Sequence, residues 1–439
     1  MKLGPILHRL LVNRWLGWLL VLPLAAMIVL TTLQYRKIEA ESGAELGKAG
    51  SMLIADAAVS NARILNDYED FYVVGRLYRE GDIVRAYDND YLTASQQRFT
   101  GSTTFMPWAY PPPLTAMMPV LPMLGLAWSY LLFMATTLAL YLWTLSRFGW
   151  ERAGAGLLAV YPALVLCIRL GQNGLLTGSL IGVTLLGLMQ RRSGAGVPLG
   201  LMVIKPHLAL GPSLLALLQR RWAVLAIAAV TVALTCALAT GVLGIGVWSA
   251  FLAGVKDAGG YLREGLYPLY RMSSVYAGVR SFGFPPEKAM AIHILVAVAA
   301  LGLLALGWSR GLPANRLMAL AAFVTLFVSP YNYDYDLACL AVAVMLVLPE
   351  LLARARWGEV IAFYALAWIG TGSGLAQHFR AVLLAGTTQH PHGSSLNWSL
   401  QAVGLLLAGA YVALILRRRP SFSAVGSTAG QGRMARGIA

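Results

Sequence analysis

Charged residues are scarce in this chain. Asp, Glu, Lys and Arg make up 12% of its 439 residues, against roughly 25% in soluble domains, while 58% of the residues are hydrophobic. The mean hydropathy is +0.65. This composition excludes a soluble globular enzyme and predicts an all-α polytopic membrane protein.

Acidic residues are scarcer than basic ones, with 19 Asp and Glu against 34 Lys and Arg and a net charge of +15. Such an excess can indicate nucleic-acid binding. Here, however, the basic residues gather in short loops at the ends of apolar runs, the pattern of the positive-inside rule. The charge therefore indicates topology and contact with anionic membrane lipids, and we expect no nucleic-acid partner.

Cysteine is nearly absent. Cys167, Cys236 and Cys339 lie far apart, each inside an apolar run, so they have neither metal-ligand spacing nor a disulfide pattern. The chain also lacks a Walker A loop and a glycine-rich dinucleotide motif, which argues against a cytosolic nucleotide site. We expect no cofactor. A divalent metal stays open, since Asp334 and Asp336 offer few of the roughly six oxygens that a hard cation prefers.

Long apolar runs fill most of the chain, and about ten are expected to cross the bilayer, which takes roughly 20 residues each. They are residues 15–33, 125–146, 153–170, 175–189, 222–247, 289–308, 317–328, 337–352, 360–374 and 396–416. Residues 195–218 carry basic residues at both ends and Lys205-Pro206 inside. Because proline breaks helices, this run predicts a hairpin of two half-helices, which the membrane tolerates around an enclosed cavity.

The basic residues before the first run place the N-terminus in the cytoplasm. That run is longer than the apolar core of a signal peptide, roughly 7–15 residues, so we expect an uncleaved span. Residues 1–416 are expected to form one transmembrane domain with a large external loop at 35–106. Residues 417–439, rich in Ser and Gly, are expected to be a disordered cytoplasmic tail.

Three acids lie within four positions of the external loop: Asp67, Glu69 and Asp70. A carboxylate there can take the proton from an attacking hydroxyl group. We predict Asp70 as this catalytic base, with Asp67 as the alternative. The structural interpretation is that all three acids stabilise the first turn of a helix ended by Gly81.

Other polar residues lie at the predicted external ends of spans. Lys205 and His207 at the hairpin break, and Arg380 in the last loop, are predicted to bind a phosphate group. The residues predicted to bind substrate are Trp108, Tyr110, Gln172, Asn173, Tyr331, Asp334 and Asp336. The structural alternatives are an interfacial aromatic belt, a lysine that reaches a lipid headgroup and, for His378 to His392, an exposed loop.

The order of these motifs resembles glycosyltransferase family 87. The resemblance rests on four motifs: Asp70-Phe71 with Gly75-Arg76-Leu77, residues 107–113, Gly171-Gln172-Asn173-Gly174 before Lys205-Pro206, and Ser329-Pro330-Tyr331 before Asp334-Tyr335-Asp336. It implies a C-type membrane glycosyltransferase fold. It also implies a lipid-linked donor such as polyprenyl-phosphate mannose, inverting transfer to a lipid or glycan acceptor, and an external aspartate base that aligns with Asp70. The expected location is a bacterial inner membrane.

Three other functions stay open at this point. A lipid-linked oligosaccharide polymerase or ligase would depend on Arg380 and the histidines near it. A transporter or flippase would have charge pairs within the membrane and inverted repeats, and no repeat is visible. A non-catalytic membrane scaffold is the third.

Overall fold

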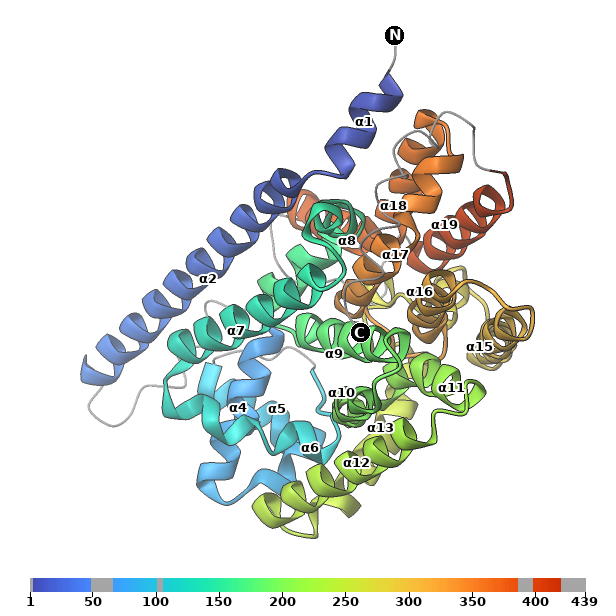
Figure 1. The fold of residues 1–439 in the computed structure, drawn as a ribbon. Coiled ribbons are helices and arrows are strands. Elements are labelled where there is room, and N and C mark those ends of the chain that lie inside the picture. Colours follow the sequence, from blue (N-terminus) through green and yellow to red (C-terminus); the bar gives the residue numbers. More distant parts are fainter. Residues whose placement is uncertain (1–2, 49–65, 101–105, 386–397, 420–439) are drawn as a thin grey trace.

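Seven helices are long and apolar enough to cross a membrane in the part of the chain that the structure, a computed structural model, describes: residues 3–48, 66–100, 106–385 and 398–419. Four of them are α7 (Leu126–Ser146), α8 (Trp150–Leu170), α12 (Trp222–Leu243) and α15 (Pro286–Ser309). The other three lie at Arg14–Ala40 in α2, Asp334–Arg354 and Trp357–Gln377 in α18. All regular secondary structure in the described chain is helical, apart from one isolated bridge between Met272 and Tyr333 (Figure 1).

Each of the ten predicted spans corresponds to a helix, but three of these helices are shorter than the length of a full span. They are α9 (Gly174–Met189), α16 (Ala314–Val324, extended by η7 at Thr325–Phe327) and α19 (Gln401–Leu416). The predicted fold class is confirmed, while the expected number of full-length spans was too high.

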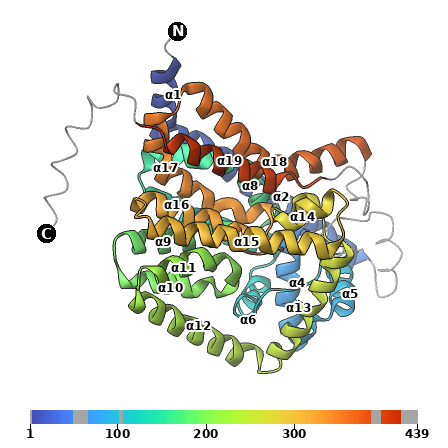
Figure 2. The same cartoon turned by 90° about the vertical axis from the view of Figure 1, so that its right-hand side faces the viewer.

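The centre of the bundle consists of α8 and the span Asp334–Arg354, which comprises η8 (Asp334–Cys339) and α17 (Leu340–Arg354). In each of them 72% of the most apolar stretch is buried, against 17% in α12 and in α15. The latter two helices therefore present most of their apolar surface to lipid. In Figure 2, α15, α11 and α12 lie side by side along one part of the molecule.

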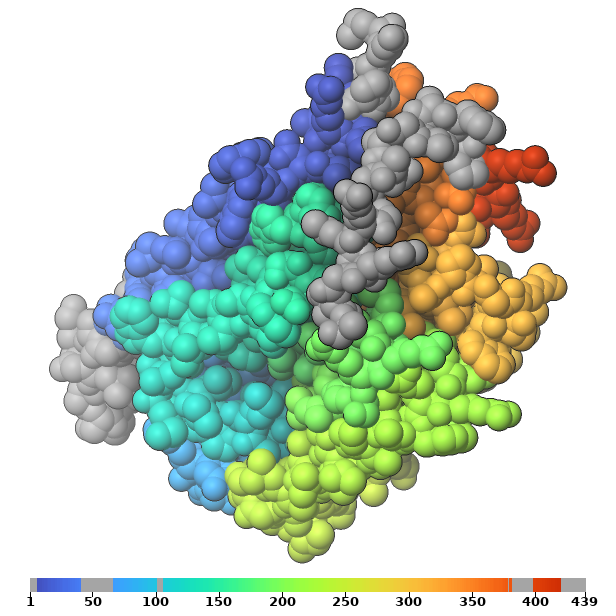
Figure 3. Space-filling model, in the orientation of Figure 1, coloured from blue at the N-terminus to red at the C-terminus, as the bar shows by residue number. Residues whose placement is uncertain are grey.

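The first long helix differs from the prediction. We expected a span at 15–33 followed by a loop, but α2 (Arg14–Lys48) continues as one helix along one edge of the molecule (Figure 3). Charged residues with good helix propensity continue it past the apolar run. One of these charged residues forms a tertiary contact with α7. The Glu39 Oε1 atom accepts hydrogen bonds from the N–H groups of Leu126 (2.7 Å) and Ala127 (3.3 Å), at the start of that helix. The N-terminal α1 (Leu3–Leu11) precedes α2.

Short helices form a layer beside the long apolar helices. They are α4 (Asp67–Glu80), η1 (Ile83–Tyr87), α5 (Asn89–Thr100), α6 (Pro112–Thr115) and η2 (Met118–Met123). As predicted, Gly81 ends α4 in the left-handed conformation, with φ of 82°. Gly75 lets α4 approach η2 closely, since a Cβ atom there would lie 2.2 Å from the Met118 carbonyl oxygen.

The predicted hairpin is present and is broken at Lys205. Its first half comprises η3 (Ser193–Ala195), α10 (Gly196–Leu201) and η4 (Met202–Ile204), and its second half comprises η5 (Pro206–Ala209) and α11 (Leu210–Leu218). Between α12 and α15 lie α13 (Val247–Glu264), η6 (Leu269–Arg271) and α14 (Val275–Ser281). Last come α18 (Trp357–Ala385) and α19.

Candidate active site

Buried polar side chains from four distant segments meet where α4 rests on the membrane helices. The segments are the start of α4, the turn before α9, the hairpin break and the start of η8. Gln172 links the first two: its Nε2 atom donates to Asp67 Oδ2 at 2.7 Å, and its Oε1 atom accepts from the Tyr110 hydroxyl at 3.1 Å. The segment that contains α4 is therefore tied directly to the apolar helices by buried hydrogen bonds.

The three acids of α4 have different surroundings. Glu69 accepts a hydrogen bond from the Asn66 N–H group at 3.3 Å, as a capping residue does. Asp67 and Asp70 are 8% and 3% exposed and instead contact side chains from other parts of the chain. Glu69 therefore stabilises the first turn of α4, whereas Asp67 and Asp70 bind side chains from other segments.

Asp70 is held on one side only. Its Oδ1 atom accepts from Gln96 Nε2 at 2.8 Å, and the same Nε2 atom donates to the Met106 carbonyl at 2.9 Å. No hydrogen bond to Asp70 Oδ2 occurs within the described residues. Burial raises the pKa of Asp70 to about 7, the nearby charge of Asp67 adds to the rise, and the Gln96 hydrogen bond opposes it.

Two glycines make the turn before α9 possible. Gly171 ends α8 with φ of 69°, a conformation that suits glycine. A Cβ atom on Gly174 would lie 2.0 Å from the Tyr335 carbonyl oxygen. Gly174 thereby lets the start of α9 pack directly against η8, which explains the glycine after Gln172-Asn173 in this motif.

Lys205 forms a buried ion pair with Asp336. The Lys205 Nζ atom lies 2.7 Å from Asp336 Oδ1, and the two side chains are 6% and 2% exposed. The ammonium group also lies over the Tyr335 ring, 4.6 Å from its centre, and 5.6 Å from that of Tyr110. The second oxygen of Asp336 accepts from the Tyr333 N–H group at 3.3 Å. Aromatic faces and a carboxylate together hold this cation.

A second cation, Arg271, was not predicted from the sequence. Its Nη2 atom lies 3.3 Å from Asp334 Oδ1, and Asp334 is fully buried. The backbone bridge between Met272 and Tyr333 brings η6 beside the turn before η8. Burial lowers the pKa of Arg271, but the charge of Asp334, followed by that of Asp67, outweighs it and raises the pKa above its ordinary value. A basic residue within an aromatic external segment was the only signal.

The remaining predicted residues have different surroundings. Trp108 is buried between Phe71 and Tyr110, and its Nε1–H group donates to Thr115 Oγ1 at 3.0 Å. Asn173 is completely buried, and neither polar atom of its side chain has a partner in the described chain. Tyr331 packs its ring edge-on against Tyr267, with 5.9 Å between centroids. Asn173 thus has a buried side-chain amide with unused hydrogen-bonding capacity.

The structure does not bring all the predicted phosphate ligands together. His207, two residues after Lys205, is half-buried, and its Nε2 atom has no partner among the described residues. Arg380 is exposed on α18. His390 and His392 lie outside the described residues, as does the side chain of His378. Lys205 and His207 therefore share a segment, whereas Arg380 stands apart.

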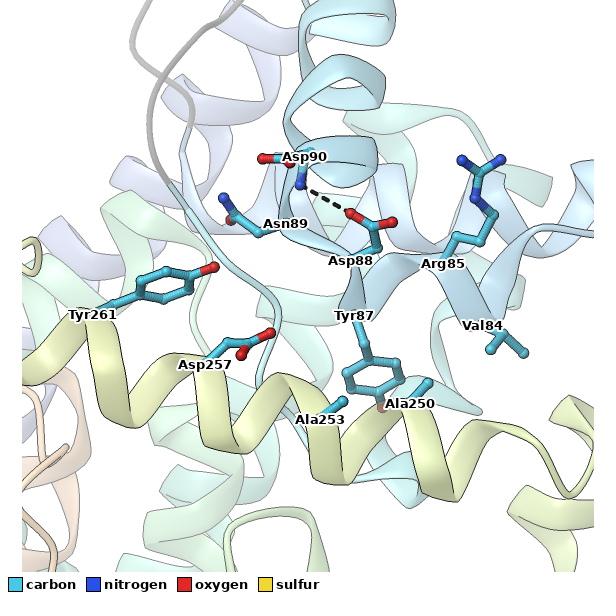
Figure 4. A pocket seen from close by; sticks show the side chains of 10 residues that line it. All are labelled: Val84, Arg85, Tyr87, Asp88, Asn89, Asp90, Ala250, Ala253, Asp257 and Tyr261. Carbon is cyan, nitrogen blue, oxygen red and sulfur yellow. Dashed lines mark hydrogen bonds between the residues drawn. The ribbon is translucent and has the colours of Figure 1, made fainter.

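An open cleft of about 400 Å³ lies between the start of α5 and α13 (Figure 4). Its polar lining includes Asp88, Asp90, Asp257 and Tyr261. Tyr87 separates it from the buried cluster, since this side chain lines the cleft while its hydroxyl donates to the Tyr110 carbonyl at 2.9 Å. In the described ranges, no three His, Cys, Asp or Glu residues gather as metal ligands, here or in the cluster.

The sequence was then compared with known proteins. The family model described as "Glycosyltransferase family 87" matches residues 108–330. The chain belongs to glycosyltransferase family 87. This is a family of C-type membrane glycosyltransferases, as the helical architecture requires. No curated protein and no solved structure matches the chain.

Membership in glycosyltransferase family 87 makes the chain a glycosyltransferase rather than a transporter or a non-catalytic scaffold. The buried Lys205–Asp336 pair is a feature that a transporter would also show, so the structure alone does not exclude that class. The family assigns glycosyl transfer, with a sugar donor and an acceptor as substrates. Tyr110, Gln172, Lys205 and Arg271 lie inside the matched region, and Asp70 lies before it.

Proposed function

We propose that this glycosyltransferase moves a hexose, with mannose as the first candidate, from a polyprenyl-phosphate sugar to a lipid or glycan acceptor. Transfer takes place on the extracytoplasmic face of a bacterial inner membrane, and both chain termini lie in the cytoplasm. Residues 1–416 form the transferase domain, and the stretch at 417–439 is a tail without a catalytic role. The reaction inverts the anomeric centre, with Asp70 as the base.

The observation that carries this proposal is the setting of Asp70. Gln96 fixes one carboxylate oxygen at 2.8 Å, and the other has no protein partner in the described chain. A pKa of about 7 matches the pH of the medium, which suits a group that must accept a proton and later release it. Asp67 is the alternative base; Gln172 binds its Oδ2 atom much as Gln96 binds Asp70 Oδ1, and the raised pKa of Asp70 favours Asp70.

In the proposed step, the acceptor hydroxyl group gives its proton to Asp70 Oδ2 as its oxygen attacks the anomeric carbon. The bond from that carbon to the phosphate oxygen breaks, and polyprenyl phosphate leaves with an added negative charge. General-base help of this kind contributes roughly 10²–10⁴ in rate. A base on the face opposite the leaving group gives inversion.

The leaving phosphate requires positive charge, and Lys205 and Arg271 supply it. Lys205 gives one N–H group to Asp336 and keeps two, while Arg271 has five donors and directs two of them to Asp334. Each cation is held by an aspartate before substrate arrives, so little reorganisation is needed when charge develops. His207 is proposed as a further phosphate ligand through its unpartnered Nε2 atom.

Sugar and acceptor hydroxyl groups require uncharged partners. Asn173 has an amide without partners, and Gln172 and Tyr110 already form a hydrogen-bonded pair beside it. The other residues proposed to line the substrate site are Trp108, Tyr331, Asp334 and Asp336. Arg380 is exposed, and we propose that it contacts the phosphate of the donor as the donor enters the site.

The donor class is tested in membrane vesicles that contain the protein. Radiolabelled mannose is offered either on polyprenyl phosphate or on a nucleotide diphosphate, with vesicles of an empty strain as background. We expect transfer to an organic-extractable or glycan product from the lipid-linked donor only. Transfer from the nucleotide sugar in vesicles that lack polyprenyl phosphate would contradict the proposal.

A further inference from the structure

We propose that a groove between α15, α16, α17 and α19 binds one anionic phospholipid, with its headgroup on Arg310 and Arg417 and an acyl chain inside. This inference does not depend on the proposed donor or acceptor. It concerns a cavity that shares no residue with the buried polar cluster.

The groove has a volume of about 580 Å³, enough for an acyl chain. Aliphatic side chains line most of its length, among them Leu303, Leu320, Val344 and Leu406. The helices that form it lie at the right-hand side of Figure 1. Polar lining is confined to the ends, so the interior suits hydrocarbon.

Basic residues gather at one end of this groove. Arg310 follows the last residue of α15, Arg417 follows the last residue of α19, and Arg316 lies in the first turn of α16. All three line the cavity. Headgroups of anionic lipids bind such basic pockets between membrane helices.

The acids nearby are already engaged. Glu350 accepts hydrogen bonds from Arg316 and lies 3.1 Å from Arg354, and Glu359 lies 2.6 Å from Arg418. Arg310 and Arg417 have no acidic partner among the residues that the structure describes. The groove therefore ends in two uncompensated positive charges, which selects an anionic headgroup over a zwitterionic one.

The position of these arginines also separates this lipid from the proposed donor. Asp336 lies at one end of the 21-residue span Asp334–Arg354, and Glu350 with its arginines lies at the other. Asp336 and Glu350 are 14 residues apart along this span, which is about 21 Å at 1.5 Å per residue and thus most of the roughly 30 Å thickness of a hydrocarbon core. A phosphate held by Arg310 and Arg417 belongs to the leaflet opposite the polar cluster.

The test uses full-length protein purified in neutral detergent, with dioleoyl phosphatidylglycerol and dioleoyl phosphatidylcholine as probes. Binding is measured by native mass spectrometry and by the rise in melting temperature. The double variant Arg310→Gln/Arg417→Gln removes the proposed headgroup site. Its control, Arg147→Gln/Arg192→Gln, removes the same charge from exposed arginines outside the groove.

A second pair of variants tests the acyl site. Ala413→Phe places a ring in the groove, whereas Leu414→Phe places one on the neighbouring surface, which is 56% exposed and outside the lining. Both proteins keep all the arginines. Loss of lipid binding in Ala413→Phe but not in Leu414→Phe shows that the acyl chain of the lipid enters the groove.

We expect phosphatidylglycerol to bind wild type more tightly than phosphatidylcholine does. The double arginine variant should lose about thirtyfold in affinity, since each basic residue contributes about fivefold. Equal binding of the two lipids, or an unchanged double variant, would overturn the proposal. So would displacement of phosphatidylglycerol by polyprenyl phosphate from wild type and both controls, because the groove would then hold the donor chain.

Discussion

The Lys205 Nζ atom and the Asp336 Oδ1 atom lie 2.7 Å apart, although 131 residues separate them in the chain. Both side chains are buried where a broken helix meets the start of a central span. Each charge there depends on the other, because an unpaired ion in this setting is costly. The pair therefore links the stability of the bundle to the proposed phosphate site.

The first prediction separates these two roles. Lys205→Met leaves the Asp336 carboxylate unpaired and should lower the free energy of unfolding by roughly 3–5 kcal/mol. The double variant Lys205→Met/Asp336→Leu removes both charges and should recover most of that loss. Unfolding in SDS, followed by circular dichroism, measures both.

Sugar transfer by the same double variant then tests the phosphate role. We expect it to stay below a hundredth of wild type, since the cation that stabilises the leaving group is gone. A stable double variant with wild-type transfer would show that the pair is purely structural.

The second prediction concerns the pH dependence of transfer. Asp70 must be ionised to accept a proton, so activity should rise with pH through the pKa of about 7. The Gln96 hydrogen bond stabilises the ionised form, and Gln96→Leu should therefore move the midpoint of the profile to higher pH. Gln97→Leu, at an exposed neighbouring position, is the control and should leave the midpoint unchanged. If wild type, Gln96→Leu and Gln97→Leu had the same pH profile, the titrating group would not be Asp70.

The third prediction concerns stability. Folding raises the pKa of Asp70 from 3.8 to about 7, so the folded protein keeps a proton that the unfolded chain releases between these values. The stabilising effect is complete below pH 4 and is lost as pH rises through 7. Asp70→Asn does not titrate, and its amide can donate to the unpartnered Gln96 Oε1 atom if the Gln96 amide rotates. Its melting temperature relative to wild type should increase between pH 5 and pH 8, and a constant difference would contradict the raised pKa.

A fourth prediction tests the close approach at Gly174. An added Cβ atom would meet the Tyr335 carbonyl oxygen at 2.0 Å, and backbone must move to relieve the clash. Gly174→Ala should cost about 1–3 kcal/mol of stability and displace the Gln172 side chain. Gly241→Ala, where nothing lies within 4 Å, is the matched control within a membrane helix. Equal melting temperatures for the two variants would argue against the packing described.

Local patterns predicted much of this structure. The hairpin break at Lys205, the end of α4 at Gly81 and the apolar helices all follow from proline, glycine and hydropathy, which act over a few residues. The run of charged residues after position 34 was misleading, because charge ends a membrane span without ending a helix.

Pairings between distant segments could not be predicted. Nothing near Lys205 specifies Asp336, and nothing near Asp70 specifies Gln96, since those contacts arise only when the helices pack. Arg271 was missed for the same reason: its role depends on the bridge between Met272 and Tyr333. The chemical types of the site residues were visible in the sequence, and their partners required the fold.

The most direct test of the account compares sugar transfer from polyprenyl-phosphate mannose by wild type, Asp70→Asn and Asp67→Asn, each checked for folding and amount in the membrane. The account predicts that Asp70→Asn loses at least a hundredfold in rate while Asp67→Asn keeps measurable transfer, because Asp70 is the proposed base, whereas Asp67 is linked through Gln172 to Tyr110. Wild-type rates in Asp70→Asn would contradict the account and move the base elsewhere.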